Sequence, residues 1–402
     1  IENGAADLMW HFKWMGGSLR HSPAFSSEQI AAVLDDMEAH YRAEGLGMSG
    51  VLTARFEDAW SAGRWDEAEA LRQRLEATPR DSHSHCDACG RSQFAGYFAE
   101  TGREADAVRL VEEMIEGGFR CGEEPEHALS RSLIPYLRLG RFDEARHTHL
   151  RSYRMAKDNP DNLDIVANNL VFCAITGNEA RALNLLERHV GWLGHDGLNA
   201  HGHLRALGAV ALALDSVVRA GHPDAVVRGA DAASLVPFFG AHEGEWTAAE
   251  LAPAAWAAAE RIAAAFDARN GTDAEAVRLA AVRALADERY DVPINSDSFA
   301  ATVTTTQPQD AAGRLQRAID LAEWGAPVEG VAAARRSVDD AEALALTDRR
   351  RLASLLIGGL VALDEIDDAA AHLPQRIALL REAGLHAQAD LAERRGLAMF
   401  GL

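Results

Sequence analysis

The segment Gly63-Arg64-Trp65-Asp66-Glu67-Ala68 decides the fold, because the same short phrase returns three more times along the chain. In each copy a glycine follows an apolar stretch, polar residues come next, and an alanine stands five residues after the glycine. The other copies are Gly102-Arg103-Glu104-Ala105-Asp106-Ala107, Gly140-Arg141-Phe142-Asp143-Glu144-Ala145 and Gly177-Asn178-Glu179-Ala180-Arg181-Ala182. Successive glycines are 39, 38 and 37 residues apart. A period of this size indicates a repeat protein.

Each part of the phrase has a physical reason to stand where it does. Glycine can end a helix in the left-handed conformation because it has no Cβ atom. The acidic residues that follow would lie in the first turn of the next helix, where negative charge complements the helix dipole. The alanine leaves room for two antiparallel helices to approach closely. The sequence therefore predicts helix-turn-helix hairpins stacked on copies of themselves.

This pattern resembles the tetratricopeptide repeat. Phe94, Ala95 and Phe98 match the large, small and aromatic positions of the first helix of such a repeat, and Tyr136 holds the aromatic position in the next copy. The period is longer than the family's, which is about 34 residues. The resemblance implies an all-α fold, a right-handed superhelical stack of antiparallel helix pairs. It also implies a concave groove lined by the first helix of each pair.

The chain divides into four predicted segments. They are N-terminal capping helices at 1–47, tetratricopeptide-like repeats at 48–195, a divergent helical region at 196–290 and C-terminal helical hairpins at 307–402. In the first segment, Trp10 and Trp14 share one helix face. We interpret that helix as a cap on the first repeat, with a partner-binding or membrane-surface helix as the alternative. The stretch 288–309 contains two prolines, a threonine-rich run and no helical period, and predicts a domain boundary at 290–306.

Composition narrows the classes of function. Alanine and leucine dominate the apolar residues and aromatics make up only 6%, which favours closely packed helices over sheets. The net charge of −21 repels phosphates, so we expect no nucleic-acid partner. The basic run 348–351 is interpreted as a solvated helix face.

No apolar stretch reaches the roughly 18 residues that a membrane span needs, and no signal peptide is evident, so a cytoplasmic protein without membrane insertion is expected. The scarcity of lysine, which occurs only at positions 13 and 157, is typical of a GC-rich bacterium.

Cysteine and histidine gather around residue 86. Cys86 and Cys89 form a CxxC pair, and one 38-residue period after Cys86 falls at position 124, between Cys121 and His127. Zinc prefers four Cys or His ligands. We therefore expect one structural zinc ion held by Cys86, Cys89, Cys121 and His127, with His83 or His85 as alternatives to His127, stapling the second repeat to the third. The alternatives are cysteines that are simply small buried groups, in which case no cofactor is present, or a redox pair.

The predicted groove would be lined by polar and aromatic side chains of the first helices. Adjacent asparagines are poor helix formers, so their pair at 168–169 is the more specific of these features. The predicted groove residues are Arg55, Asp58, Gln93, Tyr97, Arg131, Asn168 and Asn169.

Three interpretations of function stay open. The first is a non-catalytic scaffold or regulatory adaptor that binds a peptide or protein in the groove. The second is a ligand-sensing regulator that holds a small molecule or peptide. The third is a metal-dependent enzyme that uses the segment around His83. The sequence contains no HExxH, phosphate loop or nucleophile elbow, so we favour the first and expect no enzyme activity.

Overall fold

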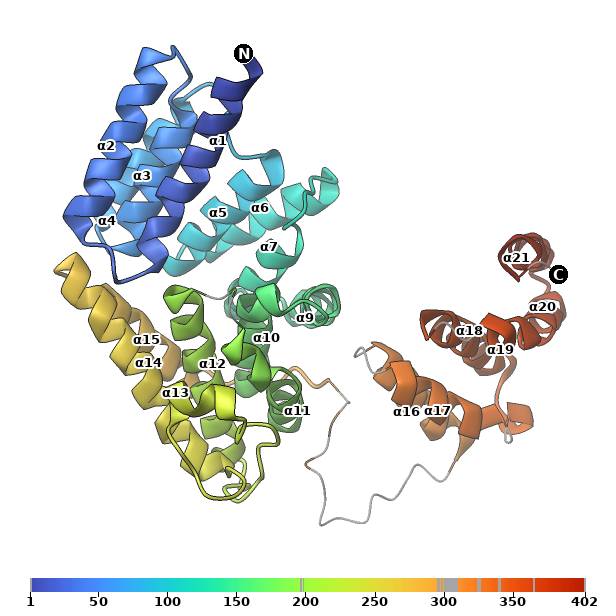
Figure 1. The fold of residues 1–402 in the computed structure, drawn as a ribbon. Coiled ribbons are helices and arrows are strands. Elements are labelled where there is room, and N and C mark those ends of the chain that lie inside the picture. Colours follow the sequence, from blue (N-terminus) through green and yellow to red (C-terminus); the bar gives the residue numbers. More distant parts are fainter. Residues whose placement is uncertain are drawn as a thin grey trace. The chain divides into compact units, whose positions relative to one another are not determined.

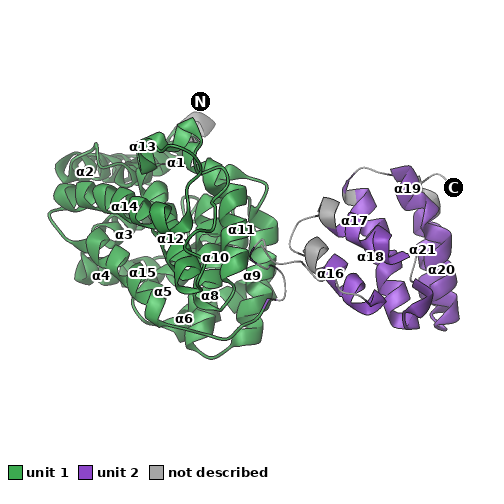
Figure 2. Ribbon diagram, turned by 90° about the horizontal axis from the view of Figure 1, so that it is seen from below, with its two compact units in different colours: residues 1–293 green, residues 294–402 purple. Residues whose placement is uncertain are grey.

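The protein is all-α, as predicted. The computed structural model describes residues 2–195, 197, 199–294, 297, 299, 310–323, 327–338, 341–363 and 366–400. Across these residues there are helices and no β-strand, apart from one isolated bridge between Val226 and Thr247. The chain forms two compact units, residues 1–293 and 294–402 (Figure 2).

Many helices of the first unit pack in neighbouring pairs (Figure 1). Its helices are α1 (Glu2–Ser18), α2 (Ser27–Ala43), α3 (Ser49–Ser61), α4 (Trp65–Ala77), α5 (Asp87–Glu100), α6 (Glu104–Glu116), α7 (Glu126–Arg131), α8 (Leu133–Arg138), α9 (Phe142–Ala156), α10 (Leu163–Ile175), α11 (Glu179–His189), α12 (Ala200–Arg219), α13 (Val236–Phe239), α14 (Ala248–Asn270) and α15 (Ala274–Ala284). The pairs α3–α4, α5–α6, α8–α9 and α10–α11 each turn at one of the four repeated glycines.

The repeated Gly-to-Ala phrase builds the turns in the way that its residues predict. The four glycines have φ between 71° and 77°, in the left-handed region that suits glycine. The four alanines, at positions 68, 107, 145 and 182, are at most 1% exposed, each between its own helix and the partner helix. In the third pair the first helix is divided into α7 and α8 before Pro135, whose ring nitrogen cannot donate the helical hydrogen bond to residue 131.

The segment 196–290 contains the longest helix pair, α12 and α14, which pack against each other. Their facing surfaces are rich in alanine, with Ala209, Ala213, Ala255 and Ala259 all at most 3% exposed. Small side chains of this kind let two long helices approach closely. Neither helix, nor any other in the described part of the chain, combines the length and the hydropathy needed to cross a membrane.

Helix α1 covers one end of the core and leaves its other face in solvent. Met9 is buried with Leu34, Met37 and Tyr41. In contrast, Trp14 is 45% exposed. The ammonium group of Lys13 donates to the carbonyl oxygen of His83 at 2.8 Å, which ties this helix to the loop before α5.

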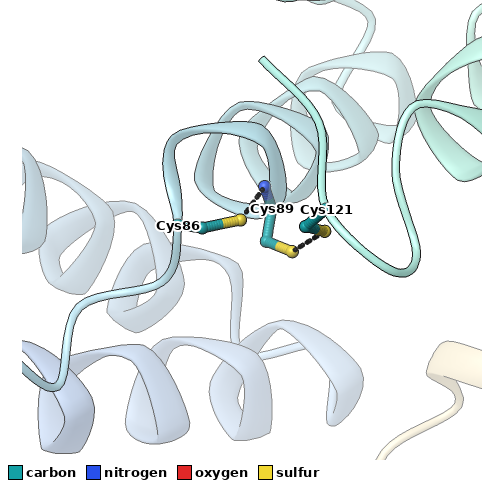
Figure 3. Close-up of side chains that lie close together, drawn as sticks. All are labelled: Cys86, Cys89 and Cys121. Atoms are coloured by element: carbon teal, nitrogen blue, oxygen red, sulfur yellow. Dashed lines mark hydrogen bonds between the residues drawn. The ribbon is translucent and has the colours of Figure 1, made fainter.

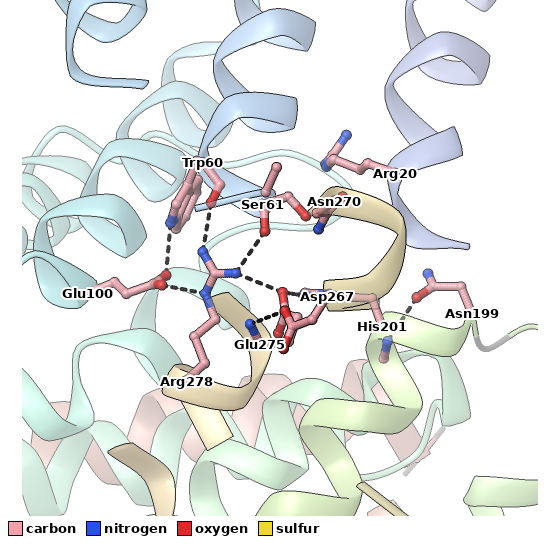
Figure 4. Close-up of polar contacts among 12 residues, drawn as sticks. Arg20, Trp60, Ser61, Glu100, Asn199, His201, Asp267, Asn270, Glu275 and Arg278 are labelled. Atoms are coloured by element: carbon pink, nitrogen blue, oxygen red, sulfur yellow. Dashed lines mark hydrogen bonds and ion pairs between the residues drawn. The ribbon is translucent and has the colours of Figure 1, made fainter. Parts of the chain in front are cut away.

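The C-terminal end of the first unit contacts the hairpin formed by α3 and α4, and Arg278 of α15 makes the central contact (Figure 4). Its guanidinium donates to the carbonyl oxygens of Trp60 and Ser61, at 2.6 and 2.8 Å, at the C-terminal end of α3. It also pairs with the carboxylates of Glu100 at 2.6 Å and Glu275 at 2.7 Å. The carbonyl groups that end a helix have no partner within the helix, so a cation placed there is favourable.

Two further contacts connect the C-terminal end of the first unit to its N-terminal part. Arg269 donates to the carbonyl oxygens of Arg20 and Ser22, at 2.9 and 2.8 Å, beside the short helical turn η1 (Leu19–His21). The hydroxyl of Thr272 donates to the carbonyl oxygen of Ala62 at 3.1 Å, just before the first repeated glycine. The end of the first unit is therefore fixed to its beginning.

The second unit contains α16 (Ala311–Glu323), α17 (Pro327–Val338), α18 (Leu346–Ala362), α19 (Ile366–Ala371), α20 (Leu373–Glu382) and α21 (His386–Phe400). Helix α16 packs on α17 and α20 packs on α21, so this unit also consists of neighbouring pairs. Its core holds Leu315, Ala334, Leu352 and Leu356. Residues 324–326 and 364–365 lie outside the described residues.

We expect Arg278→Gln to lower the free energy of unfolding by about 3 kcal/mol, because it leaves the buried Glu275 carboxylate and two helix-end carbonyls without their partner. Chemical denaturation of the full chain measures this change. Arg283→Gln is the matched control on the same helix, since Arg283 and Glu260 form an exposed pair worth less than about 1 kcal/mol. Equal effects of the two substitutions would contradict the role of Arg278.

Candidate functional site

Polar side chains on the first helices of successive pairs contact one another at the spacing of the repeat. Gln93 of α5 donates to the carboxylate of Glu57 on α3. Arg131 of α7 donates to the hydroxyl of Ser92 at 3.3 Å. Asn168 of α10 donates to the hydroxyl of Ser130 at 3.0 Å.

A charged pair continues this series. Nδ1 of His127 on α7 lies 3.3 Å from a carboxylate oxygen of Asp164 on α10. We call the whole set the polar ladder. Its members are Glu57, Ser92, Gln93, His127, Ser130, Arg131, Asp164 and Asn168.

The centre of the polar ladder brings acidic and basic side chains together. Burial would raise the pKa of Asp164, but the hydrogen bond and charge of His127, with the charges of Arg131 and Arg205, hold that pKa well below its usual range. Burial likewise opposes a charge on His127, yet the Asp164 carboxylate outweighs it and raises the pKa of the imidazole. Asp164 thus lies near three basic groups, and the buried carboxyl group of Glu124 lies near two of them, Arg131 and His127.

Arg205 of α12 lies close to Arg131 and Asp164. Its side chain is exposed to solvent. Nevertheless, the surrounding protein desolvates its guanidinium enough to lower the pKa, with the charge of Arg131 adding to the effect. The nearby His201 ring is also desolvated, which lowers its pKa well below the usual value.

The seven predicted groove residues divide into two groups. Gln93, Arg131 and Asn168 belong to the polar ladder. Arg55 instead pairs with Asp35 and Glu38 on α2, at 2.7 and 2.6 Å.

The remaining three are engaged within the fold. Asp58 pairs with Arg64 at 2.6 Å. Tyr97 is only 3% exposed and its ring packs against Phe56. Asn169 is fully buried, with its amide bonded to Ser152 and to the carbonyl oxygen of Ile165, so it joins helices α9 and α10 instead of facing a ligand.

Sequence reasoning missed Glu57, Ser92, Ser130, Asp164 and Arg205, and assigned His127 to a metal. A signal for them is present in the spacing. The contacting pairs 57–93, 92–131, 130–168 and 127–164 are separated by 36, 39, 38 and 37 residues, close to the glycine period. A search for polar residues repeated at that period on the first helices would have found them.

Three thiols meet between the start of α5 and the loop before α7 (Figure 3). Cys86 is the N-cap of α5, and its sulfur accepts from the backbone N–H of Cys89 at 3.3 Å. The sulfurs of Cys89 and Cys121 are 3.4 Å apart. All three sulfurs lie within 4.8 Å of one another, and Cys86 and Cys121 are exposed. The group could hold a metal ion.

The pKa values of Cys86 and Cys89 are shifted in opposite directions. Burial opposes ionisation of Cys86, but hydrogen bonds from the backbone N–H groups of Cys89 and Ala88 and from the neighbouring thiols lower its pKa. Burial raises the pKa of Cys89, and the adjacent Cys86 and Cys121 raise it further. Of these two thiols, Cys86 is therefore the one that ionises first.

The histidines expected to complete this group have other neighbours. His127 pairs with Asp164 in the polar ladder. His83 is buried against the ring of Tyr41, and its Nδ1 lies 3.1 Å from the hydroxyl of Ser82. His85 packs edge-on against Trp14. Within the side chains that the structure describes, the metal-ligand group consists of the three cysteines.

We expect His127→Gln to destabilise the protein more at about pH 5.5 than at about pH 8.5. The folded state raises the pKa of His127 above 6.5, so the pair with Asp164 contributes its full stability below that value. This contribution is lost as the pH rises through the folded pKa. Chemical unfolding at both pH values measures the difference.

The matched control for this substitution is His40→Gln, which removes an exposed pair with Asp36. Such pairs contribute little stability, so the control should show a much smaller effect at either pH. A loss for His127→Gln that is equal at both pH values, or larger at the higher one, would contradict the ion pair.

No protein-family model matches the chain, and no curated protein sequence matches it. Its function therefore has to be inferred from the geometry of the molecule.

Proposed function

We propose that residues 1–293 form a tetratricopeptide-like superhelix that binds an extended peptide or protein segment along the polar ladder, without catalysing a reaction. The observation that supports this best is the ladder itself, because its hydrogen bonds recur from one helix pair to the next. Polar groups that recur at a regular spacing along the helix pairs suit an extended chain better than a compact partner.

The chemistry of the ladder indicates what kind of segment it would bind. The side-chain amides of Gln93 and Asn168 carry donors and acceptors that match the groups of a peptide backbone. Arg131 and Arg205, next to His127, offer donors to a carboxylate, and guanidinium groups bind carboxylates in a fixed fork geometry. We therefore propose an extended segment with at least one acidic side chain near its middle.

The ladder's own hydrogen bonds would make binding selective. The members of the polar ladder already have partners in the protein, so a ligand has to replace bonds such as Asn168–Ser130 and Arg131–Ser92. A segment that fails to match them leaves polar groups unpaired, which costs about 1–3 kcal/mol for each group.

We also propose that one zinc ion binds the three thiols and has a structural role. Zinc–sulfur bonds of about 2.3 Å in a tetrahedron place sulfurs about 3.8 Å apart, so the thiols fit after small side-chain rotations. When bound, the ion would tie the first turn of α5 to the loop that carries Cys121. Water or a further ligand would take the fourth position.

The peptide proposal is tested by selecting binders from a displayed random-peptide library on the full chain. We expect selected peptides to be enriched in Asp and Glu. They should bind Arg131→Gln/Asn168→Ala at least about tenfold more weakly, which corresponds to about 1.4 kcal/mol. Titration calorimetry measures the affinities, and thermal unfolding shows whether the variant remains folded.

The matched control for this experiment is Arg146→Gln/Asn184→Ala, which changes the same residue types on the second helices α9 and α11. Its affinity should stay within about twofold of the parent. Equal loss in both variants, or none in either, would show that the peptides bind elsewhere and would contradict the proposed groove.

For the zinc proposal we expect about one equivalent of zinc in protein purified without chelator, and less than about a tenth in Cys86→Ser/Cys121→Ser. Elemental analysis measures this. Chelation should lower the midpoint of thermal unfolding of the parent protein only. The control is Cys173→Ala, which removes a buried thiol far from the group in sequence and should keep its zinc. A parent protein free of zinc after growth with added zinc would contradict the proposal.

A further inference from the structure

The second unit contains a cavity lined by arginine side chains. Its volume is about 700 Å³. Arg350 and Arg351 reach it from α18, and Arg376 from α20. The sequence predicted the run 348–351 to be a solvated helix face, yet two of its three arginines line this cavity.

Two of these guanidinium groups lack a counter-ion. Arg351 lies 3.5 Å from Asp348, and Arg349, which points elsewhere, pairs with Glu382 at 2.9 Å. Within the described part of the chain, Arg350 and Arg376 form no ion pair. The Nε atom of each is buried without a hydrogen-bond partner. A cation without a counter-ion is costly where protein surrounds it, and because both arginines line the cavity, an anion held there would supply that counter-ion.

The rest of the lining is mixed, and its polar members are Gln316, Thr347, Ser354 and Gln388. Ile319 of α16, Leu355 of α18 and Leu380 of α20 contribute hydrocarbon surface beside the arginines. Leu380 is only 8% exposed and Ile319 is partly buried, so this wall is continuous with the core of the unit. The volume of the cavity lies within the range of about 300–1,000 Å³ that is typical of small-molecule sites.

We propose that this cavity binds a small amphipathic carboxylate. The guanidinium groups of Arg350 and Arg376 donate to the carboxylate, and the wall formed by Ile319, Leu355 and Leu380 contacts its hydrocarbon part. Guanidinium groups pair with a carboxylate through two parallel hydrogen bonds, which explains why the site uses arginine. The proposal concerns the second unit and does not depend on peptide binding by the first.

The test uses octanoate as the probe and the full chain as it exists. Phenylglyoxal modifies accessible guanidinium groups, and mass spectrometry of peptides reports the rate at each arginine. At a concentration of about four times its Kd, octanoate should slow the modification of Arg350 and Arg376 about fivefold. Arg394, an exposed arginine of α21 outside the lining, should change less than about twofold.

Two further probes separate charge from hydrophobicity. Octanamide has the same chain without the charge, and acetate has the charge without the chain. Each should protect at least about tenfold less well than octanoate at equal concentration, because each loses one of the two kinds of contact. Equal protection by octanamide would overturn the role of the arginines, and equal protection by acetate would overturn the role of the apolar wall. No protection by octanoate would overturn the site itself.

A pair of variants provides a second, independent readout. Octanoate should raise the midpoint of thermal unfolding of the parent chain, because a ligand that binds only the folded state stabilises it. Arg350→Gln/Arg376→Gln should lose this shift. Arg381→Gln/Arg394→Gln, which removes the same charge from α20 and α21 outside the cavity, should retain it. Loss of the shift in both variants would show that net charge, and not this cavity, is responsible.

Discussion

The contact between Arg278 and the end of α3 is the constraint on which the first unit depends. It joins residues 217 and 218 positions apart, and it binds two helix-end carbonyls and two carboxylates with one guanidinium group. A stack of helix pairs held only by its neighbours can bend at every joint. Because α15 is bound to the end of α3, the helix pairs between these two elements have to fit within a fixed distance. Glu275, which is 4% exposed, balances the buried charge of Arg278 and makes the contact sensitive to loss of either partner.

The polar ladder follows from this constraint. With both ends of the unit fixed, the first helices of successive pairs keep one register, so a polar residue and its counterpart about one period later face each other. Asn169 and Ser152 are fully buried and join α10 to α9. Asn168 and Asn169 are neighbours in sequence with opposite roles, because successive residues of a helix point about 100° apart. One lies at the ladder and the other holds α10 against α9.

The turns could be predicted from the sequence because their physics is local. A glycine that must be left-handed and an alanine that must be small are recognisable within six residues, and both predictions are confirmed. The cysteine group was also within reach, since one repeat period brings Cys121 near Cys86. The contacts of the histidines could not be predicted, because the partner of His127 depends on which face of α7 packs against α10. The same limit applies to Arg55 and Asp58, whose ion pairs with α2 and with Arg64 depend on how neighbouring elements pack.

The distribution of charge gives the two units a common feature. With 61 acidic and 40 basic residues, the surface as a whole repels anions. Against this background each unit brings arginines together, Arg131 and Arg205 beside Asp164 in the first and Arg350 and Arg376 at the cavity in the second. Screening limits the repulsion to about 8 Å at physiological ionic strength, so an anion meets the negative surface first and the guanidinium groups only at short range. Such an arrangement disfavours binding by charge alone. An anion gains from these arginines only if the rest of its shape fits the surface around them, the repeat spacing in one unit and the apolar wall in the other.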